Sequence, residues 1–402
     1  MYTEELTRTQ EAALTANGTY SEILEHWSNY QPEITERQLG INPTQLDTVR
    51  LDRLRIFGGH KLLVMDETVQ PSNNFKYNGL SAALHHNLTE HPGLRKIYIG
   101  SAGNAGAALV AAAGFYNNKL EFSGYDSRRL EVVVETPTDL VEMKRTLLTS
   151  DFSAVNAVHA SVEAATAVAK QKAEDDPDGI FIHAYDDPAA IAGQGFVAKR
   201  AFRSLLNMEA AGAINLSENR VKILIQRGGG SLLTGFACEL YNLKQQGILG
   251  DTVQLYQVRP EESLQHYDGL RVTMPGSYAQ TVIDDPEFVA GTIHIQDQHT
   301  SKAVHAMGHT YHKRFEPSGL AGIAGFYKEQ AVDDPTIYVT VLSGANYSSK
   351  AYDYFKDLPR RKETEFLGSL TSREYVDVDT TTQLTSPQGL NPCTYGRYPS
   401  SK

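Results

Sequence analysis

Short apolar runs alternate with longer helical patterns over most of the chain. The apolar runs predict five strands, at Leu62–Met65, Ile97–Ile99, Leu130–Val134, Ile223–Ile225 and Ile337–Val341. Alanine-rich segments lie between them and predict helices, for example at Ala105–Ala113 and Val162–Ala173. Strands that alternate with helices are typical of an α/β fold with a mostly parallel sheet.

Both ends of the chain are more polar. The stretch up to about Trp27 predicts one or two polar helices, and Gln31-Pro32 and Asn42-Pro43 mark loops after it. From about Lys356 the chain is rich in Thr, Ser and Pro, which predicts a peripheral extension and no separate regulatory domain.

The composition excludes several classes of protein. With 402 residues and 41% hydrophobic side chains, the chain can bury a large core, and disorder is not its main state. Its 37 basic and 48 acidic side chains give a net charge of −11, which disfavours a nucleic-acid partner. No apolar run approaches the roughly 20 residues that span a bilayer, and the acidic start Met1–Glu5 does not resemble a signal peptide. We therefore expect a cytoplasmic protein, and Cys238 and Cys393 are too few for a disulfide framework.

Three predicted strands end in loops of small residues that lead towards helices: Gly100–Gly106, Gly228–Gly235 and Ser343–Asn346. Ligands of parallel sheets gather at such strand ends, where helix N-termini offer free N–H groups to anions. The run Gly228–Gly230 is the strongest signal, because consecutive glycines let a phosphate approach the backbone closely. It lacks the Walker and dinucleotide spacings. A phosphorylated small cofactor therefore fits this loop better than a nucleotide.

A lysine near such a loop would indicate pyridoxal phosphate, and Lys76 is the candidate. It lies in the segment Gln70–Gly79, directly before the apolar helical run Leu80–Leu84. Partial burial next to Phe75 would lower the pKa of the amine and free it as a nucleophile. Taken alone, this segment is better explained as a surface lysine at the start of a helix.

Together these segments resemble the fold-type II pyridoxal-phosphate enzymes, and most closely the threonine and serine dehydratases of the tryptophan synthase β-like family. The family's Ser-Phe-Lys-x-Arg-Gly is similar to Asn74–Gly79, its Ser-Ser/Ala-Gly-Asn-His to Ser101–Ala105, and its Gly-Gly-Gly-Gly-Leu to Gly228–Leu232. Three further blocks resemble the family: Asp187–Gly195, Glu316–Gly319 and Leu342–Asn346. All occur in the family's order.

The resemblance implies two domains, each with a twisted, mostly parallel sheet flanked by helices, and an active site in the cleft between them. Residues 1–92 and 187–402 would form the larger, cofactor-binding domain, and residues 93–186 the smaller, substrate-binding domain. The resemblance also implies a homodimer that acts on a small amino-acid substrate.

The resemblance assigns a role to each matching residue. Lys76 would be the catalytic residue, which holds pyridoxal 5′-phosphate as a Schiff base and abstracts the Cα proton of the substrate. Phe75 would pack near the cofactor ring, Asn104 would bind the 3′-oxygen of the cofactor, and Ser343 would bind its pyridine nitrogen. The phosphate would bind to Gly228, Gly229, Gly230, Ser231 and Leu232, and the substrate carboxylate to Ser101, Ala102, Gly103, Asn104 and Ala105. A serine leaves the pyridine nitrogen unprotonated, which favours loss of a β-leaving group.

Some positions depart from the family pattern. Asn74 replaces its serine, Asn78 its arginine and Ala105 its histidine. Arg259 stands where metal-binding members carry a glutamate, so we expect no metal site. Ala102 stands where serine racemases of this fold carry a second acid–base serine, which predicts that racemisation is slow.

Other polar clusters receive simpler interpretations. His305, His309 and His312 share one face of a predicted helix and are interpreted as packed or solvated. The pairs Asp186-Asp187, Asp284-Asp285 and Asp333-Asp334 flank prolines and are interpreted as turn and cap residues. Cys238 is interpreted as a small buried residue.

The resulting hypothesis is a lyase that eliminates the β-substituent of a β-hydroxy or β-substituted α-amino acid and gives a 2-oxo acid and ammonia. One alternative is a β-replacement synthase of the cysteine synthase type, favoured by the small residues of Asn104–Gly106. An alternative of another class is a non-catalytic cofactor-binding protein, which the intact Lys76, Asn104 and Ser343 disfavour.

Overall fold

The structure is a computed structural model that describes residues 36–49, 60–122, 129–140, 142–262, 264–272, 274–329 and 335–358. The predicted N-terminal helices, the C-terminal extension after Leu358, Asp333-Asp334 and Cys393 lie outside these ranges. Within them, no helix combines the length and apolar character that a membrane crossing requires.

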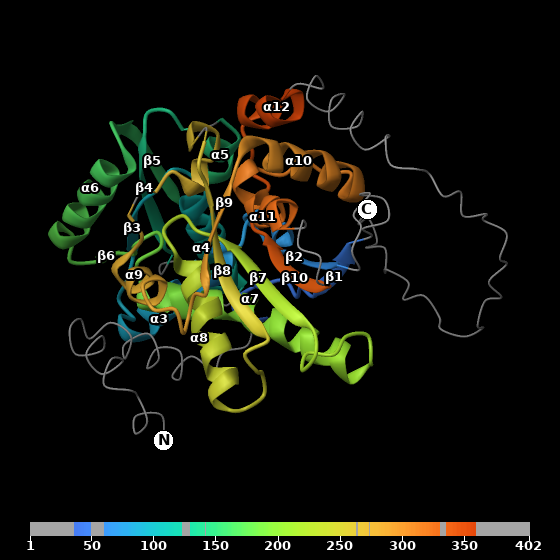
Figure 1. Ribbon diagram of the computed structural model, residues 1–402. Coiled ribbons are helices and arrows are strands. Elements are labelled where there is room, and N and C mark those ends of the chain that lie inside the picture. Colours follow the sequence, from blue (N-terminus) through green and yellow to red (C-terminus); the bar gives the residue numbers. More distant parts are fainter. Residues whose placement is uncertain are drawn as a thin grey trace, which may run out of the picture. The chain divides into compact units, whose positions relative to one another are not determined.

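The larger sheet has six strands in the order β1-β2-β10-β7-β8-β9 (Figure 1). Their bounds are β1 Leu46–Val49, β2 Lys61–Asp66, β7 Arg220–Gln226, β8 Val253–Pro260, β9 Gly291–Ile295 and β10 Thr336–Leu342. β1 is antiparallel to β2, and the other neighbours are parallel. The central strand β10 is buried along its whole length, as expected for a parallel strand that is covered on both faces.

The smaller sheet has four parallel strands in the order β5-β4-β3-β6. Their bounds are β3 Lys96–Gly100, β4 Glu131–Pro137, β5 Ser153–His159 and β6 Gly179–Phe181. The five predicted strands are confirmed as β2, β3, β4, β7 and β10. The sequence did not predict β1, β5, β6, β8 or β9. Strands β5, β6 and β9 are only partly buried and carry polar residues among the apolar ones, β8 alternates between buried and partly buried positions, and β1 has only four residues.

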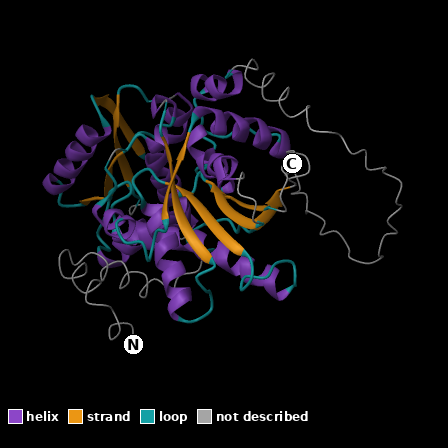
Figure 2. Cartoon of the chain, viewed as in Figure 1, coloured by secondary structure: helices purple, strands orange, loops and turns teal. Residues whose placement is uncertain are grey.

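Helices connect most of the strands (Figure 2). Their bounds are α3 Lys76–Glu90, α4 Asn104–Phe122, α5 Glu142–Leu148, α6 Val162–Asp175, α7 Pro188–Ala210, α8 Ser231–Gln245, α9 Ser277–Ile283, α10 Asp297–Tyr311, α11 Ala321–Glu329 and α12 Ser349–Asp357. Short 3₁₀ helices are η2 Glu67–Val69, η4 Leu264–His266, η5 Asp268–Leu270 and η6 Pro317–Leu320. The predicted helices around Ala105–Ala113 and Val162–Ala173 are confirmed as α4 and α6. Asp187 caps α7, since its Oδ1 accepts from Ala190 N at 2.8 Å, and Cys238 is fully buried, both as predicted.

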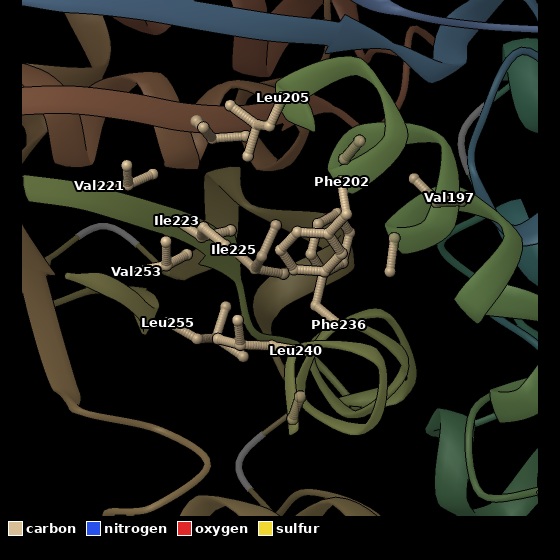
Figure 3. Packing of buried hydrophobic residues seen from close by; sticks show 14 of the residues in the cluster. Val197, Phe202, Leu205, Val221, Ile223, Ile225, Phe236, Leu240, Val253 and Leu255 are labelled. Carbon is tan, nitrogen blue, oxygen red and sulfur yellow. The ribbon is translucent and has the colours of Figure 1, made fainter. Parts of the chain in front are cut away.

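One apolar cluster holds α7 and α8 against the larger sheet (Figure 3). Phe202 of α7 and Phe236 of α8 meet with ring centroids 6.0 Å apart. The cluster also contains Ile223 and Ile225 of β7 and Leu255 of β8, all of them buried. This packing fixes the loop after β7, because that loop connects β7 directly to α8.

Candidate active site

A cavity of about 580 Å³ lies where β3, β7 and β10 end. Every site residue that the sequence predicted contributes to its wall: Phe75, Lys76, Ser101, Ala102, Gly103, Asn104, Ala105, Gly228, Gly229, Gly230, Ser231, Leu232 and Ser343. The structure thus brings together four segments that are far apart in the sequence.

Lys76 is held by backbone pairing between its own segment and the loop that carries Ser343. Asn74 Oδ1 accepts from the backbone N–H of Lys76 at 3.1 Å at the start of α3. The N–H of Phe75 donates to the carbonyl of Ser343 at 3.0 Å, and the N–H of Ala345 donates to the carbonyl of Asn73 at 3.0 Å. The loop that carries Ser343 therefore positions the lysine.

The amine of Lys76 is poised to lose its proton. Burial lowers the pKa of Lys76 to about 8; the Glu316 carboxylate opposes this shift and the Lys144 ammonium adds to it. The Nζ atom lies 4.5 Å from the centroid of the Phe75 ring. A substantial share of the amine is therefore neutral slightly above neutral pH, as a nucleophile or base requires.

The loop after β7 forms a cradle for an anion. Within the described part of the chain, the backbone N–H groups of Gly228, Gly229, Gly230, Ser231 and Leu232 have no hydrogen-bond acceptor, and no side chain caps α8. Gly230 has a φ of 102°, which favours glycine. At Gly229, a Cβ atom would lie 2.1 Å from the Tyr185 ring. These free N–H groups at a helix N-terminus suit a phosphate.

The loop after β3 offers a second set of N–H groups. The Ser101 hydroxyl accepts hydrogen bonds from the backbone N–H groups of Gly103, at 3.0 Å, and Gly106, at 2.9 Å. The N–H groups of Ala102, Asn104 and Ala105 have no acceptor among the described residues. The loop can therefore bind a carboxylate at the start of α4, while the Ser101 hydroxyl is committed to the loop itself.

A charged network in the cavity wall was missed by the sequence reasoning. Asn104 Nδ2 donates to both carboxylate oxygens of Glu316, at 2.8 and 3.0 Å, and Asn346 Nδ2 donates to Asn104 Oδ1 at 3.0 Å. The Lys144 ammonium lies 3.2 Å from Asp268 Oδ2 and 3.9 Å from Glu316 Oε2. Burial raises the pKa of Glu316, against the opposing effects of Lys144 and Asn104.

The sequence held a signal for only part of this network. Glu316 belongs to the block Glu316–Gly319, one of the segments that resemble the family in sequence. Lys144 gave none, because a lysine on a short helix is ordinarily exposed, whereas its side chain is only 2% exposed here.

The structure also explains Asn78, which replaces the family's arginine. Asn78 Oδ1 accepts from Nη2 of Arg200 in α7 at 3.0 Å, and Asn78 Nδ2 donates to Glu67 Oε2 at 2.8 Å. Arg200 also forms ion pairs with Glu67 at 2.8 Å and Glu36 at 2.7 Å. Burial works against the charge of Arg200, but Glu67 and Glu36 outweigh it and raise its pKa. An arginine from another helix thus supports the segment that carries Lys76.

No group of three or more His, Cys, Asp or Glu side chains within the described ranges could hold a metal ion. His305 and His309 lie on α10, and His312 follows its end. Arg259 lies on β8.

Comparison with known proteins identifies the class. The family described as pyridoxal-phosphate dependent enzyme matches residues 37–344, and the chain belongs to this family. The fold is that of the fold-type II enzymes, as predicted. The cradle at Gly228–Leu232, the amine of Lys76 and the Ser343 hydroxyl fit pyridoxal phosphate, because they offer partners for its phosphate, aldehyde and ring nitrogen.

Several relatives are similar to the chain at low identity. The biosynthetic L-threonine dehydratase of Pasteurella multocida is 23% identical over 312 residues, which are 74% of this chain and 56% of that protein. The serine racemase of Bos taurus is 25% identical over 204 residues, which are 50% of this chain and 52% of that protein. The chain thus spans just over half the length of these curated relatives.

Solved structures show the same fold. The processed threonine deaminase isoform 2 of Solanum lycopersicum has a TM-score of 0.63 at 20% identity, over 85% of this chain and 94% of that one. The O-acetylserine dependent cystathionine β-synthase of Helicobacter pylori has a TM-score of 0.58 at 17% identity, over 79% of this chain and 97% of that one.

Proposed function

We propose that this enzyme is a lyase that eliminates the β-substituent of a β-hydroxy or otherwise β-substituted α-amino acid and releases a 2-oxo acid and ammonia. One observation carries the proposal: a single cavity holds two separate groups of free N–H donors and a lysine of lowered pKa. A phosphorylated aldehyde cofactor and an amino-acid substrate together require two anion-binding sites, one for the phosphate and one for the carboxylate, and an amine that can react with the aldehyde.

When bound, pyridoxal phosphate supplies an electron sink for the charge that develops at Cα. Lys76 would hold the cofactor and then remove the Cα proton. The N–H groups of Ala102, Asn104 and Ala105 would orient the substrate by its carboxylate. The Ser343 hydroxyl, buried and without a partner among the described residues, would give the ring nitrogen a neutral hydrogen bond, which favours elimination.

We further propose that the two sheets belong to two domains, residues 1–92 with 187–402 and residues 93–186. The strands of the smaller sheet all fall between Lys96 and Phe181, which supports this division.

A β-replacement synthase is the second candidate, because the loop Ser101–Ala105 has Ala105 where the dehydratases have a histidine. Purified enzyme would be offered serine, threonine and their O-acyl and O-phospho forms, with and without thiols or amines. Release of 2-oxo acid without added nucleophile supports the lyase, whereas an adduct formed in preference to 2-oxo acid supports the synthase.

Lys76→Ala serves as the control for both candidates. Borohydride reduction of the cofactor-loaded enzyme, followed by peptide mapping, should place the reduced adduct on Lys76 in the unmodified enzyme. An Lys76→Ala variant that keeps the same reducible adduct would overturn the assignment.

A further inference from the structure

Two arginines and a histidine lie side by side at the ends of β7, β8 and β9. Gln226 of β7 is in register with Val258 of β8, so the next residues, Arg227 and Arg259, are neighbours across the two strands. The N–H of Arg227 donates to the carbonyl of Val258 at 3.0 Å, which continues the ladder to this point. Arg259 is in turn in register with His294 of β9. In-register neighbours project from the same face of a sheet, so the three side chains form one row.

The two guanidinium groups have no counter-charge within the described part of the chain. Arg227 is only 9% exposed, and its Nε donates to Gln257 Oε1 at 3.0 Å. Its Nη1 is buried without a hydrogen-bond acceptor. Arg259 is partly buried and makes no ion pair or hydrogen bond with a described side chain. Burial, and then the charge of Arg259, lower the pKa of Arg227 to about 10.

Such an arrangement is costly by itself. Like charges on directly opposed strand positions destabilise a sheet. A buried N–H donor without an acceptor also destabilises the folded state, and more strongly when it belongs to a charged group. The row reaches solvent at His294, which is exposed, as is Thr292 on the same strand. The carboxylate of Glu261 approaches only this outer end, 3.9 Å from His294 Nδ1.

We propose that Arg227 and Arg259, with His294 at the solvent side, form a binding site for a small oxyanion such as inorganic sulfate or phosphate. The forked guanidinium groups match the oxygens of such an anion, which would accept from the unpaired Nη1 of Arg227 and separate the two positive charges. None of the three side chains lines the cavity that contains Lys76, so the site is distinct from the proposed active site. The proposed site is adjacent to the phosphate cradle along the chain, because Arg227 directly precedes Gly228.

The test uses the enzyme saturated with pyridoxal phosphate, so that the Gly228–Leu232 cradle is already filled. Sulfate, phosphate, acetate and chloride are titrated at matched ionic strength by calorimetry, and unfolding temperatures are measured in parallel. Sulfate or phosphate should bind one to one and raise the unfolding temperature more than acetate or chloride does. Arg259→Gln should weaken that binding at least tenfold. The matched control Arg203→Gln, at an exposed arginine of α7, should not change it.

A second variant gives an effect of opposite sign. Arg259→Glu places a carboxylate beside Arg227, so it should raise the unfolding temperature in anion-free buffer and abolish the response to sulfate. The proposal is overturned if chloride stabilises as well as sulfate at equal ionic strength, or if Arg259→Gln and Arg259→Glu both bind sulfate like the unmodified enzyme. Retention of the cofactor absorbance spectrum shows that each variant is folded.

Discussion

Gly230 offers a sharp test of the phosphate cradle, because two separate features of the structure require glycine there. Its backbone has φ 102° and ψ −10°, and a Cβ atom would lie 2.2 Å from the Cβ of Ala279. We consider the substitution Gly230→Ala. The matched control is Gly247→Ala at the other end of α8, where φ is 69° but no atom lies within 4 Å of the added Cβ.

The structure sets the expected magnitudes. An L-residue in a left-handed conformation costs about 1–2 kcal/mol, and both variants incur this cost. The contact with Ala279 adds about 1–3 kcal/mol of overpacking at Gly230 alone. Gly230→Ala should therefore destabilise the protein by about 2–5 kcal/mol, and Gly247→Ala by about 1–2 kcal/mol.

The two variants should also differ in cofactor affinity. The chain relieves the strain at position 230 by moving the loop backbone, which turns the free N–H groups away from the phosphate. If only about 1.4 kcal/mol of the strain opposes binding, the affinity for pyridoxal phosphate falls tenfold. We expect at least this loss for Gly230→Ala and none for Gly247→Ala.

Urea denaturation of the apoenzyme gives the stabilities, and titration of the apoenzyme with pyridoxal phosphate, followed by absorbance, gives the affinities. The reasoning fails if Gly230→Ala is no less stable than Gly247→Ala and binds the cofactor as tightly as the unmodified enzyme. That result would mean that residues 228–232 do not form the phosphate cradle.

Three further predictions follow from the site. Burial lowers the pKa of Lys76 to about 8, and only the neutral amine attacks an aldehyde. The rate of cofactor binding to the apoenzyme should therefore rise about tenfold per pH unit below pH 8 and level off above it. A stopped-flow pH profile without a break near pH 8 would contradict this. Ala102 faces the cavity without a proton to exchange, so racemisation in deuterated water should be slower than elimination or replacement by roughly 10²–10⁴-fold. Ala102→Ser should increase the yield of deuterated D-enantiomer, and an unchanged yield would argue against this placement of the loop. Lys144→Met should destabilise the protein by about 3–5 kcal/mol, because it leaves the buried Glu316 carboxylate without this cation. The exposed control Lys170→Met should change stability by less than about 0.5 kcal/mol, and equal urea midpoints for the two variants would refute this account.

The sequence by itself determined the features that depend on local requirements. Buried parallel strands must be continuous apolar runs, so β2, β3, β4, β7 and β10 were predictable. The phosphate cradle needs glycine for a positive φ and for the close approach of a phosphate to the backbone, so the run Gly228–Gly230 predicted it. Strands β1, β5, β6, β8 and β9 were not predicted, because a very short or partly exposed strand need not be a continuous apolar run.

Only the tertiary structure decided which charges meet. Asn104 and Glu316 are 212 residues apart in the sequence, and Arg200 lies 122 residues from the Asn78 that it supports. Lys144 is buried because Asp268 and Glu316 happen to face it, and Arg227 and Arg259 are neighbours through the register of β7 and β8. A charged side chain has no preferred burial of its own: its environment is set by the partners that folding brings within a few ångströms.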